Sequence, residues 1–171
     1  MTVAETVDVQ GFAVTREVDA PPEAVWEAWA DPGLLRRWWG PTGFTCPRAE
    51  VDLRVGGTTL VTMQAPAEYG GFQVHNRWTY TVVERPARIE FVSTFADADG
   101  AVITPEDAGI PPGVAAEVPH VVDLEPLPGG RTRLTVTERG YSSAEAAEMS
   151  RQGQEQCLEK LAALWPAERD A

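Results

Sequence analysis

The chain has 171 residues, of which 43% are hydrophobic and 23% charged, a balance that predicts one folded domain rather than a disordered chain. Acidic residues outnumber basic ones by 26 to 14, and the net charge of -12 argues against nucleic acids and anionic membranes as partners. No stretch approaches the roughly 20 apolar residues of a membrane span, and the N-terminus lacks a signal-peptide pattern, so we expect a cytoplasmic protein.

One strand and two short helices are predicted first. Residues 11–19 alternate between apolar and polar side chains, as a half-buried strand does. The sequence Pro-Pro-Glu at 21–23 is typical of a helix start, and Asp-Pro-Gly at 31–33 indicates a second one, with the aspartate as its cap. We expect the second helix to end at residues 40–41, because proline cannot continue the helical hydrogen-bond ladder.

A series of antiparallel strands follows, with glycine pairs and other turn signals between them. They are predicted at residues 45–55, 58–65, 72–84, 88–95, 120–125 and 131–139. The intervening segment 97–119 is longer than an ordinary connection, and we predict that it is a long loop or a lid.

A long helix is predicted to close the chain. Ser142 and Glu145 have the spacing of a capping box, and apolar residues at helical spacing continue to Trp165. Gly153 falls in the middle of this helix, where a bend or a close contact would explain it. The order of elements therefore predicts an α+β fold in which one strongly curved sheet wraps against the last helix and leaves room for a cavity.

Several segments together resemble a known family. They are VTREVDAPPEAVWEAWADPGLLRRWWGP from Val14, DLRVGG from Asp52, TFADADG from Thr94 and GQEQCLEKLAALW from Gly153. In this order they are similar to the heat-shock protein 90 ATPase activator homologues, which belong to the START-like (SRPBCC, helix-grip) superfamily. The resemblance covers roughly residues 10–165, so we expect a single START-like domain over 10–166, preceded by an N-terminal extension at 1–9.

The resemblance implies a helix-grip fold with about six or seven strands and an apolar cavity for a hydrophobic small molecule. Relatives often carry a Gly-Trp pair in the last helix, whereas this chain has Gly153 and Gln154, which removes an aromatic wall and points to a different ligand. The chaperone activator proper also has a separate N-terminal domain. Residues 1–9 are too short to supply one, so we do not expect this chain alone to stimulate a chaperone ATPase.

Signatures of metal and cofactor chemistry are absent from the sequence. His75 and His120 are the only histidines, and no zinc-site, phosphate-loop, dinucleotide or nucleophile-elbow motif occurs. We therefore expect no metal and no cofactor. Cys46 and Cys157 are far apart in the sequence and are predicted to be free, packed thiols.

Polar residues on the predicted inward face of the sheet are the first candidates for a ligand site. Asn76, Trp78 and Tyr80 share one face of the longest strand, and an amide and a phenol among apolar groups can orient a ligand. His120 has the same strand parity as Val122. His120 and Tyr80 are weak candidates for general acid and base. Tyr80 equally fits a core polar group satisfied by its neighbours, and His120 fits better a strand-end histidine bonded to backbone or water.

Four tryptophans lie within fourteen positions, more aromatic surface than two short helices usually bury. We expect Trp26 and Trp38 to be packed in the core, and Trp29 and Trp39 to lie nearer the mouth of a cavity.

The leading hypothesis is a cytoplasmic protein that binds a small aromatic, polycyclic or lipid-like molecule. Its alternatives are a cyclase, dehydratase or hydrolase on the same cavity, and a co-chaperone-like interaction module; a monomer and a homodimer both stay open. The predicted ligand-binding residues are Trp29, Trp39, Phe44, Asn76, Trp78, Tyr80, Phe95, His120, Val122, Met149, Gly153 and Cys157.

Overall fold

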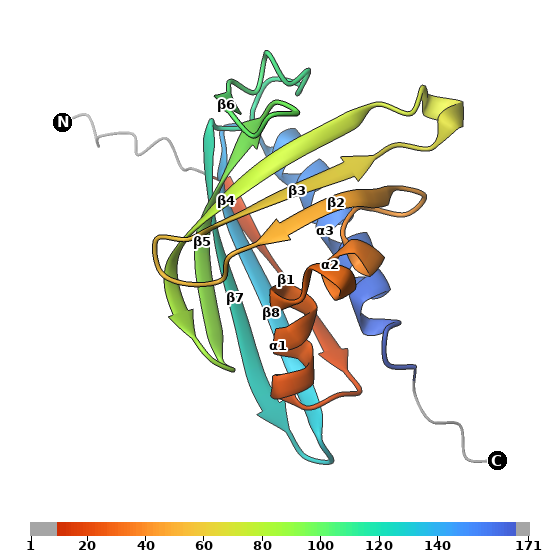
Figure 1. The fold of residues 1–171 in the computed structure, drawn as a ribbon, viewed down its shortest axis with the longest axis vertical. Helices are drawn as coiled ribbons and strands as arrows, with labels where there is room; N and C mark the ends of the chain where they lie inside the picture. Colours follow the sequence, from red (N-terminus) through yellow and green to blue (C-terminus); the bar gives the residue numbers. More distant parts are fainter. Residues whose placement is uncertain (1–9, 167–171) are drawn as a thin grey trace.

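The computed structural model describes residues 10–166, which form a curled antiparallel sheet with a long helix on its concave side (Figure 1). The predicted extension at residues 1–9 lies outside the described residues. β1 (Gln10–Val18) leads into α1 (Pro22–Ala30) and α2 (Pro32–Trp38), as predicted. The carboxylate of Asp31 caps α2, since its Oδ1 accepts a hydrogen bond from the backbone N of Gly33 at 2.8 Å.

The sheet follows the order β1-β8-β7-β5-β4-β3-β2, and each neighbouring pair is antiparallel. A 3-10 turn, η1 (Ala67–Tyr69), joins the third strand to the fourth. The remaining strands are β2 (Thr45–Val51), β3 (Thr58–Gln64), β4 (Gln73–Glu84), β5 (Arg88–Ala96), β6 (Val102–Ile103), β7 (Glu117–Leu127) and β8 (Arg131–Tyr141).

The main differences from the predicted strands are at their ends. β2 stops at Val51 rather than at residue 55, because the backbone turns there: the N of Arg54 donates to the O of Asp52, and the N of Gly57 donates to the O of Arg54. β7 begins three residues before the predicted start at residue 120, and β8 continues two residues past the predicted end at 139.

The long segment 97–119 is tied to the sheet at several points. β6 lies within it and pairs with β5, and β7 begins at Glu117. The N of Ala115 donates to the O of Gly140 at 2.7 Å, and the N of Ser142 donates to the O of Gly113 at 2.9 Å. The segment therefore covers the end of the molecule where β8 meets the last helix.

α3 (Ala144–Ala162) is the long final helix, and it ends three residues before the predicted end at 165. Its cap is Ser143, whose Oγ accepts from the N of Ala146 at 3.1 Å. The predicted capping box is wrong, because Ala146 rather than Glu145 occupies the third position after this cap.

One face of α3 changes character along its length, and this change leaves space under the sheet. Leu158 and Leu161, in the C-terminal half, are fully buried in the main core with Trp26, Trp29 and Trp38. The N-terminal half presents smaller or polar side chains toward the sheet, among them Ser150 and Gly153. The core is therefore filled at one end of the helix and hollow at the other.

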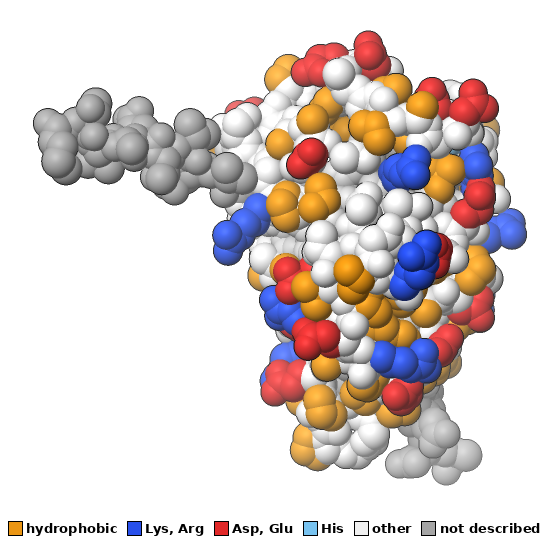
Figure 2. Space-filling model, turned by 60° about the vertical axis from the view of Figure 1, so that its left-hand side comes forward, with side chains coloured by type: hydrophobic (Ala, Val, Ile, Leu, Met, Phe, Trp, Pro, Cys, Tyr) orange, Lys and Arg blue, Asp and Glu red, His pale blue; other side chains and the backbone are white. Residues whose placement is uncertain are grey.

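The outer surface mixes both signs of charge. On the face shown in Figure 2, acidic, basic and apolar side chains are interspersed, and this face shows no extended basic patch.

Candidate functional site

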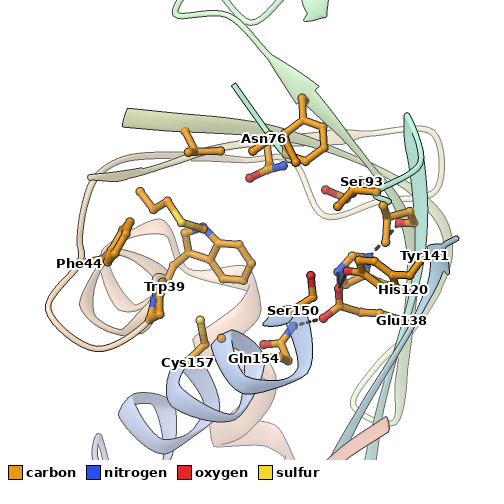
Figure 3. Close-up of a pocket in the computed structure, with 18 of the residues that line it drawn as sticks. Trp39, Phe44, Asn76, Ser93, His120, Glu138, Tyr141, Ser150, Gln154 and Cys157 are labelled. Carbon is orange, nitrogen blue, oxygen red and sulfur yellow. Dashed lines mark hydrogen bonds and ion pairs between the residues drawn. The ribbon is translucent and has the colours of Figure 1, made fainter. Parts of the chain in front are cut away.

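A partly open cavity of about 330 Å3 lies between the concave face of the sheet and the middle of α3, from Ser150 to Cys157. Figure 3 shows Trp39 and Phe44 on one side of it and His120, Glu138 and Tyr141 on the other. One side of the cavity is thus aromatic and apolar, and the opposite side is polar.

Apolar side chains from β3, β4, β5 and the α2–β2 connection form the first side. Phe44 and Phe72 meet edge to face with ring centroids 5.9 Å apart, and the ring of Trp39 packs against that of Trp78 with centroids 4.9 Å apart. Such edge contacts hold the rings in fixed orientations. The apolar residues on this side are Trp39, Phe44, Met63, Phe72, Val74 and Phe95.

Lys160 holds the α2–β2 connection in place. Its ammonium group donates to the carbonyl oxygens of Gly40 and Phe44, both at 3.0 Å. Gly40 and Phe44 lie at the two ends of the turn that contains Pro41. Oε1 of Gln156, also on α3, accepts from the N of Thr42 in this turn at 3.0 Å, so α3 positions this part of the cavity wall through two side chains.

A row of polar residues crosses the concave face on four adjacent strands. Asn76 lies on β4, Ser93 on β5, His120 on β7 and Glu138 on β8. His120 and Glu138 are direct cross-strand partners, and Ser93 pairs with Val118, two residues from His120. The row is therefore diagonal, and all four of its side chains are buried and line the cavity.

Glu138 is the centre of a buried hydrogen-bonded cluster (Figure 3). Its Oε1 accepts from the hydroxyl of Tyr141 at 2.8 Å and lies 3.2 Å from Nε2 of His120. Its Oε2 accepts from Nε2 of Gln154 at 2.7 Å, so that the cluster links β7, β8 and α3. A buried carboxylate is stable only with such a set of partners.

The hydrogen-bond partners of His120 and Glu138 indicate where the protons of this cluster lie. A carbonyl oxygen can only accept, so Nδ1 of His120, 2.9 Å from the O of Val118, carries a proton. Nε2 faces Oε1 of Glu138 at 3.2 Å, so the ring lies in position to form an ion pair with this carboxylate. Burial alone would raise the pKa of Glu138, but the charge of His120 and the hydrogen bonds from His120, Gln154 and Tyr141 hold it below its usual value.

A bulge in β8 brings Glu138 and Tyr141 onto the same face. Residues three apart on a regular strand point to opposite faces, yet both of these side chains are buried at the cavity. Phe12 pairs with Glu138 and Gln10 pairs with Tyr141. Between these two pairs β8 has one residue more than β1, which is a β-bulge. Gly140 makes the bulge feasible, because its φ of 112° is one that other residues rarely adopt.

Seven of the twelve predicted ligand-binding residues line the cavity. Among them, burial raises the pKa of Cys157 to about 12, so its thiol stays protonated and behaves as an apolar group. Cys157 and Cys46 are both free and buried, as predicted. The seven are Trp39, Phe44, Asn76, Phe95, His120, Gly153 and Cys157.

The other five predicted residues do not line the cavity. Trp29, Trp78, Tyr80 and Val122 belong to the packed core next to it, and each is at most 2% exposed. The prediction that Trp29 lies at the cavity mouth is therefore wrong; Trp39 does line the cavity, and Trp26 and Trp38 are packed as expected. Met149 was assigned to the inward stripe of the last helix, but it is 67% exposed.

The two weak catalytic candidates are both engaged by the protein. The hydroxyl of Tyr80 lies 2.5 Å from Oγ1 of Thr59 in the core, and burial raises the pKa of Tyr80 to about 12. Both ring nitrogens of His120 already have partners, as described above. In this arrangement neither side chain offers a free group to exchange a proton with a molecule in the cavity.

The sequence reasoning missed Glu138, Tyr141, Ser93 and the role of Gln154, although three of them carried a signal. Glu138 has the parity of the buried Leu134 and Val136, and Gln154 lies three and four residues before Cys157 and Leu158 on the inward face of α3. Ser93 likewise has the parity of the buried Phe91 on β5. Tyr141 carried no such signal, since the bulge reverses its expected direction.

Segment 110–114 separates the cavity from a second hollow. Ile110 and Val114 line both, and the second hollow lies between this segment and the first turns of α3, where Met149 contributes to its wall.

Gly153 faces open space, since an added Cβ would meet no atom within 4 Å, so the expected close contact there is wrong.

Residues 10–166 hold no group of metal ligands and no helix suited to cross a membrane. No three histidine, cysteine or carboxylate side chains in this range are grouped as metal ligands. No helix of the range is both long and apolar enough to cross a membrane.

Comparisons with known proteins agree with this architecture. A family model described as "Activator of Hsp90 ATPase homolog 1-like protein" matches residues 19–165. Among solved structures, protein Ms6760 from Mycobacterium smegmatis is 27% identical with a TM-score of 0.74, and the match covers 96% of this chain and 95% of that one. The comparison with curated proteins found no significant match.

Two further solved structures are similar over most of their length. A protein from Arthrobacter aurescens is 31% identical with a TM-score of 0.73, covering 95% of this chain and 90% of that one. The AHSA1 protein from Silicibacter pomeroyi is 25% identical with a TM-score of 0.70, covering 91% and 96%. The predicted family resemblance and the predicted helix-grip fold are confirmed.

Proposed function

The chain belongs to the family of Activator of Hsp90 ATPase homolog 1-like proteins, and we propose that it binds a small, mainly apolar molecule in the cavity between its sheet and α3. The observation that carries this proposal is the hollow itself. Protein interiors are close-packed, whereas the partly open cavity of about 330 Å3 under this sheet leaves apolar wall atoms without protein contacts. A ligand supplies those contacts.

The size and lining of the cavity support a small-molecule ligand. Ligand sites have volumes of roughly 300–1,000 Å3 and combine a mostly apolar wall with a few polar groups that fix orientation. Here the aromatic side chains around Trp39 and Phe44 provide apolar area, and the row from Asn76 to Glu138 provides the polar groups. Affinity then comes mainly from burial of apolar surface, at roughly 25 cal/mol per Å2.

Two segments of the wall are suited to admit the ligand. Phe44 and Phe72 lie at the edge of the cavity, and Phe72 is 51% exposed. On another side, segment 110–114 separates the cavity from the outer hollow. We propose that the side chains of Ile110 and Val114, within the predicted lid, rearrange to open the path, while backbone bonds at Gly113 and Ala115 hold the segment to β8 and its end.

The test uses substitutions at Gly153, where a side chain can be added without strain. Gly153 has no positive φ, and its added Cβ meets no atom within 4 Å. Gly153→Phe places a ring in the cavity, and Gly153→Ala is the matched control that leaves most of the volume free. A panel of polyketides, sterols, flavonoids and lipids is screened for a rise in melting temperature and for quenching of tryptophan emission.

The expected result is that at least one compound class stabilises the wild type and Gly153→Ala, in proportion to the logarithm of ligand concentration over its Kd, but not Gly153→Phe. Trp39 lies in the cavity wall, so its emission reports directly on occupancy. The proposal is refuted if no compound binds the wild type, or if compounds bind Gly153→Phe equally well.

A further inference from the structure

The hydrogen bonds that the protein leaves unmade define the chemical class of the ligand, if the proposed function holds. Nδ2 of Asn76 donates to the O of Thr94 at 3.4 Å, which leaves its Oδ1 free. Within residues 10–166, neither this Oδ1 nor Oγ of Ser93 has a hydrogen-bond partner; both residues are largely buried, but these two atoms are still accessible from the cavity. Figure 3 shows both side chains pointing into the cavity.

Two more wall residues carry unsatisfied polar atoms. Oε1 of Gln154 and Nε1 of Trp39 are buried and have no partner among the described residues. A buried polar group without a partner costs about 1–3 kcal/mol, and for this reason native proteins rarely keep several of them together. Such groups around one hollow indicate a molecule that supplies hydrogen bonds there.

The position of Asn76 relative to Ser93 suits a single hydroxyl group. Asn76 pairs with Phe95 across β4 and β5, and Ser93 lies two residues from that partner, so the two residues are diagonal neighbours. Diagonal neighbours lie roughly 7–8 Å apart at the backbone, and two hydrogen bonds of about 2.8 Å each span the gap between their side-chain ends. Oδ1 of Asn76 can only accept, whereas Oγ of Ser93 can donate.

The charges around the cavity select against ionised ligands. His120 is the only described wall residue able to carry a positive charge, and Glu138 already neutralises it. Lys160 is held by the carbonyl oxygens of Gly40 and Phe44 and does not line the cavity. A carboxylate would therefore lose its hydration without gaining a cation, and a free amine would find both oxygens of Glu138 occupied.

We infer that the cavity is built for a neutral, mainly apolar molecule with a hydroxyl group, which donates to Oδ1 of Asn76 and accepts from Oγ of Ser93. The aromatic body of the ligand then lies against the Trp39 and Phe44 side. Asn76 and Ser93 determine specificity in this arrangement, and the His120–Glu138 pair maintains the neutral, rigid wall beside them.

The experiment compares three probes of one shape by isothermal titration calorimetry: 2-naphthol, 2-methylnaphthalene and 2-naphthoate. They are titrated against the wild type, Asn76→Leu, Ser93→Ala and Thr79→Val. Thr79 lies on β4 next to Trp78 but is exposed on the outer face, so Thr79→Val is the control. Each protein is judged by the ratio of its own affinities, so a change in stability cancels.

We expect the wild type and Thr79→Val to bind 2-naphthol about tenfold more tightly than 2-methylnaphthalene, and 2-naphthoate most weakly. In Asn76→Leu the ratio of the affinities for 2-naphthol and 2-methylnaphthalene falls to about one, because only 2-naphthol loses affinity. Ser93→Ala lowers the same ratio by a smaller factor. Equal binding of 2-naphthol and 2-methylnaphthalene by the wild type overturns the inference but leaves the proposed function intact. Two other results overturn the inference and leave the proposed function intact: tightest binding of 2-naphthoate, or a ratio of 2-naphthol to 2-methylnaphthalene affinity that is the same in the wild type and both variants. Binding of none of the probes overturns the inference, and the broad compound panel with the Gly153 variants then decides the proposed function.

Discussion

Nε2 of Gln154, on α3, donates a 2.7 Å hydrogen bond to Oε2 of Glu138, on β8 (Figure 3). This contact joins the helix to the sheet beside the hollow part of the core, where apolar packing between the two is missing. The Glu138 cluster therefore has a structural role: it holds the walls of the cavity apart at a fixed distance, while Leu158 and Leu161 anchor the other end of the helix.

The first prediction concerns the buried charge of Glu138. The ring of His120 stacks on that of Phe91 with centroids 4.6 Å apart, and the phenyl ring of His120→Phe can keep this stacking. The substitution leaves the carboxylate of Glu138 without its ion-pair partner. We expect a loss of about 3–5 kcal/mol in the free energy of unfolding, measured by urea titration. Adding Glu138→Gln to the same protein removes the unpaired charge and recovers part of this loss. A double variant less stable than His120→Phe alone would contradict the role given to the pair.

The second prediction is the pH dependence of the same carboxylate. The pKa of Glu138 in the folded protein lies below its ordinary value of 4.5, so its ionised form stabilises the fold. That contribution is fully present above pH 4.5 and is lost as the pH falls through the folded-state pKa. Urea unfolding of the wild type and Glu138→Gln between neutral pH and about pH 3 measures it. The stability advantage of the wild type shrinks on acidification; an advantage that grows would have the wrong sign.

Two glycines provide a third prediction, with opposite signs for the same substitution. Gly153→Ala adds a Cβ in open space within a helix, and we expect stabilisation of up to about 1 kcal/mol. Gly140→Ala is destabilising, because φ there is 112° and the added Cβ would lie 3.1 Å from the O of Glu117. Thermal unfolding of both variants checks the pair. A stable Gly140→Ala would show that the bulge in β8 does not fix the position of Tyr141.

The overall fold could be predicted from the sequence because its signals are local and repeated. Strand alternation and helix starts at Pro22 and Asp31 placed the elements to within a few residues. The inward face of β4 was also correct, since Asn76, Trp78 and Tyr80 are all buried there.

The polar side of the site was harder to predict, because charged and amide side chains are normally assigned to solvent. Nε2 of Gln154 donates to Glu138 between two consecutive elements, a strand and a helix, and neither the strand period nor the helix period records that contact. The distinction between core and cavity wall is a matter of a few ångströms. Trp29 and Trp39 have similar spacing signals, yet only Trp39 reaches the hollow.

A fourth prediction tests how α3 controls the cavity wall. Lys160→Met keeps the aliphatic part of the side chain but removes the donor to Gly40 and Phe44. We expect faster hydrogen exchange at residues 42–46 with little change elsewhere, because this connection then keeps the bond from the N of Thr42 to Oε1 of Gln156 but loses both bonds from Lys160. Arg151→Met is the control, since Arg151 makes exposed contacts to Glu148 and Glu155 on the same helix. Unchanged exchange at 42–46 in Lys160→Met would show that other contacts position Phe44.

The most direct test of the central claim is a crystal structure of the protein under xenon pressure. Xenon enters apolar hollows that are large enough and leaves packed cores empty, so it reports the cavity without knowledge of the natural ligand. We predict xenon density beside Trp39, Phe95 and Gly153 in the wild type and none at this place in Gly153→Phe. Side chains that fill this space in the wild type, with no xenon between the sheet and α3, would contradict the account.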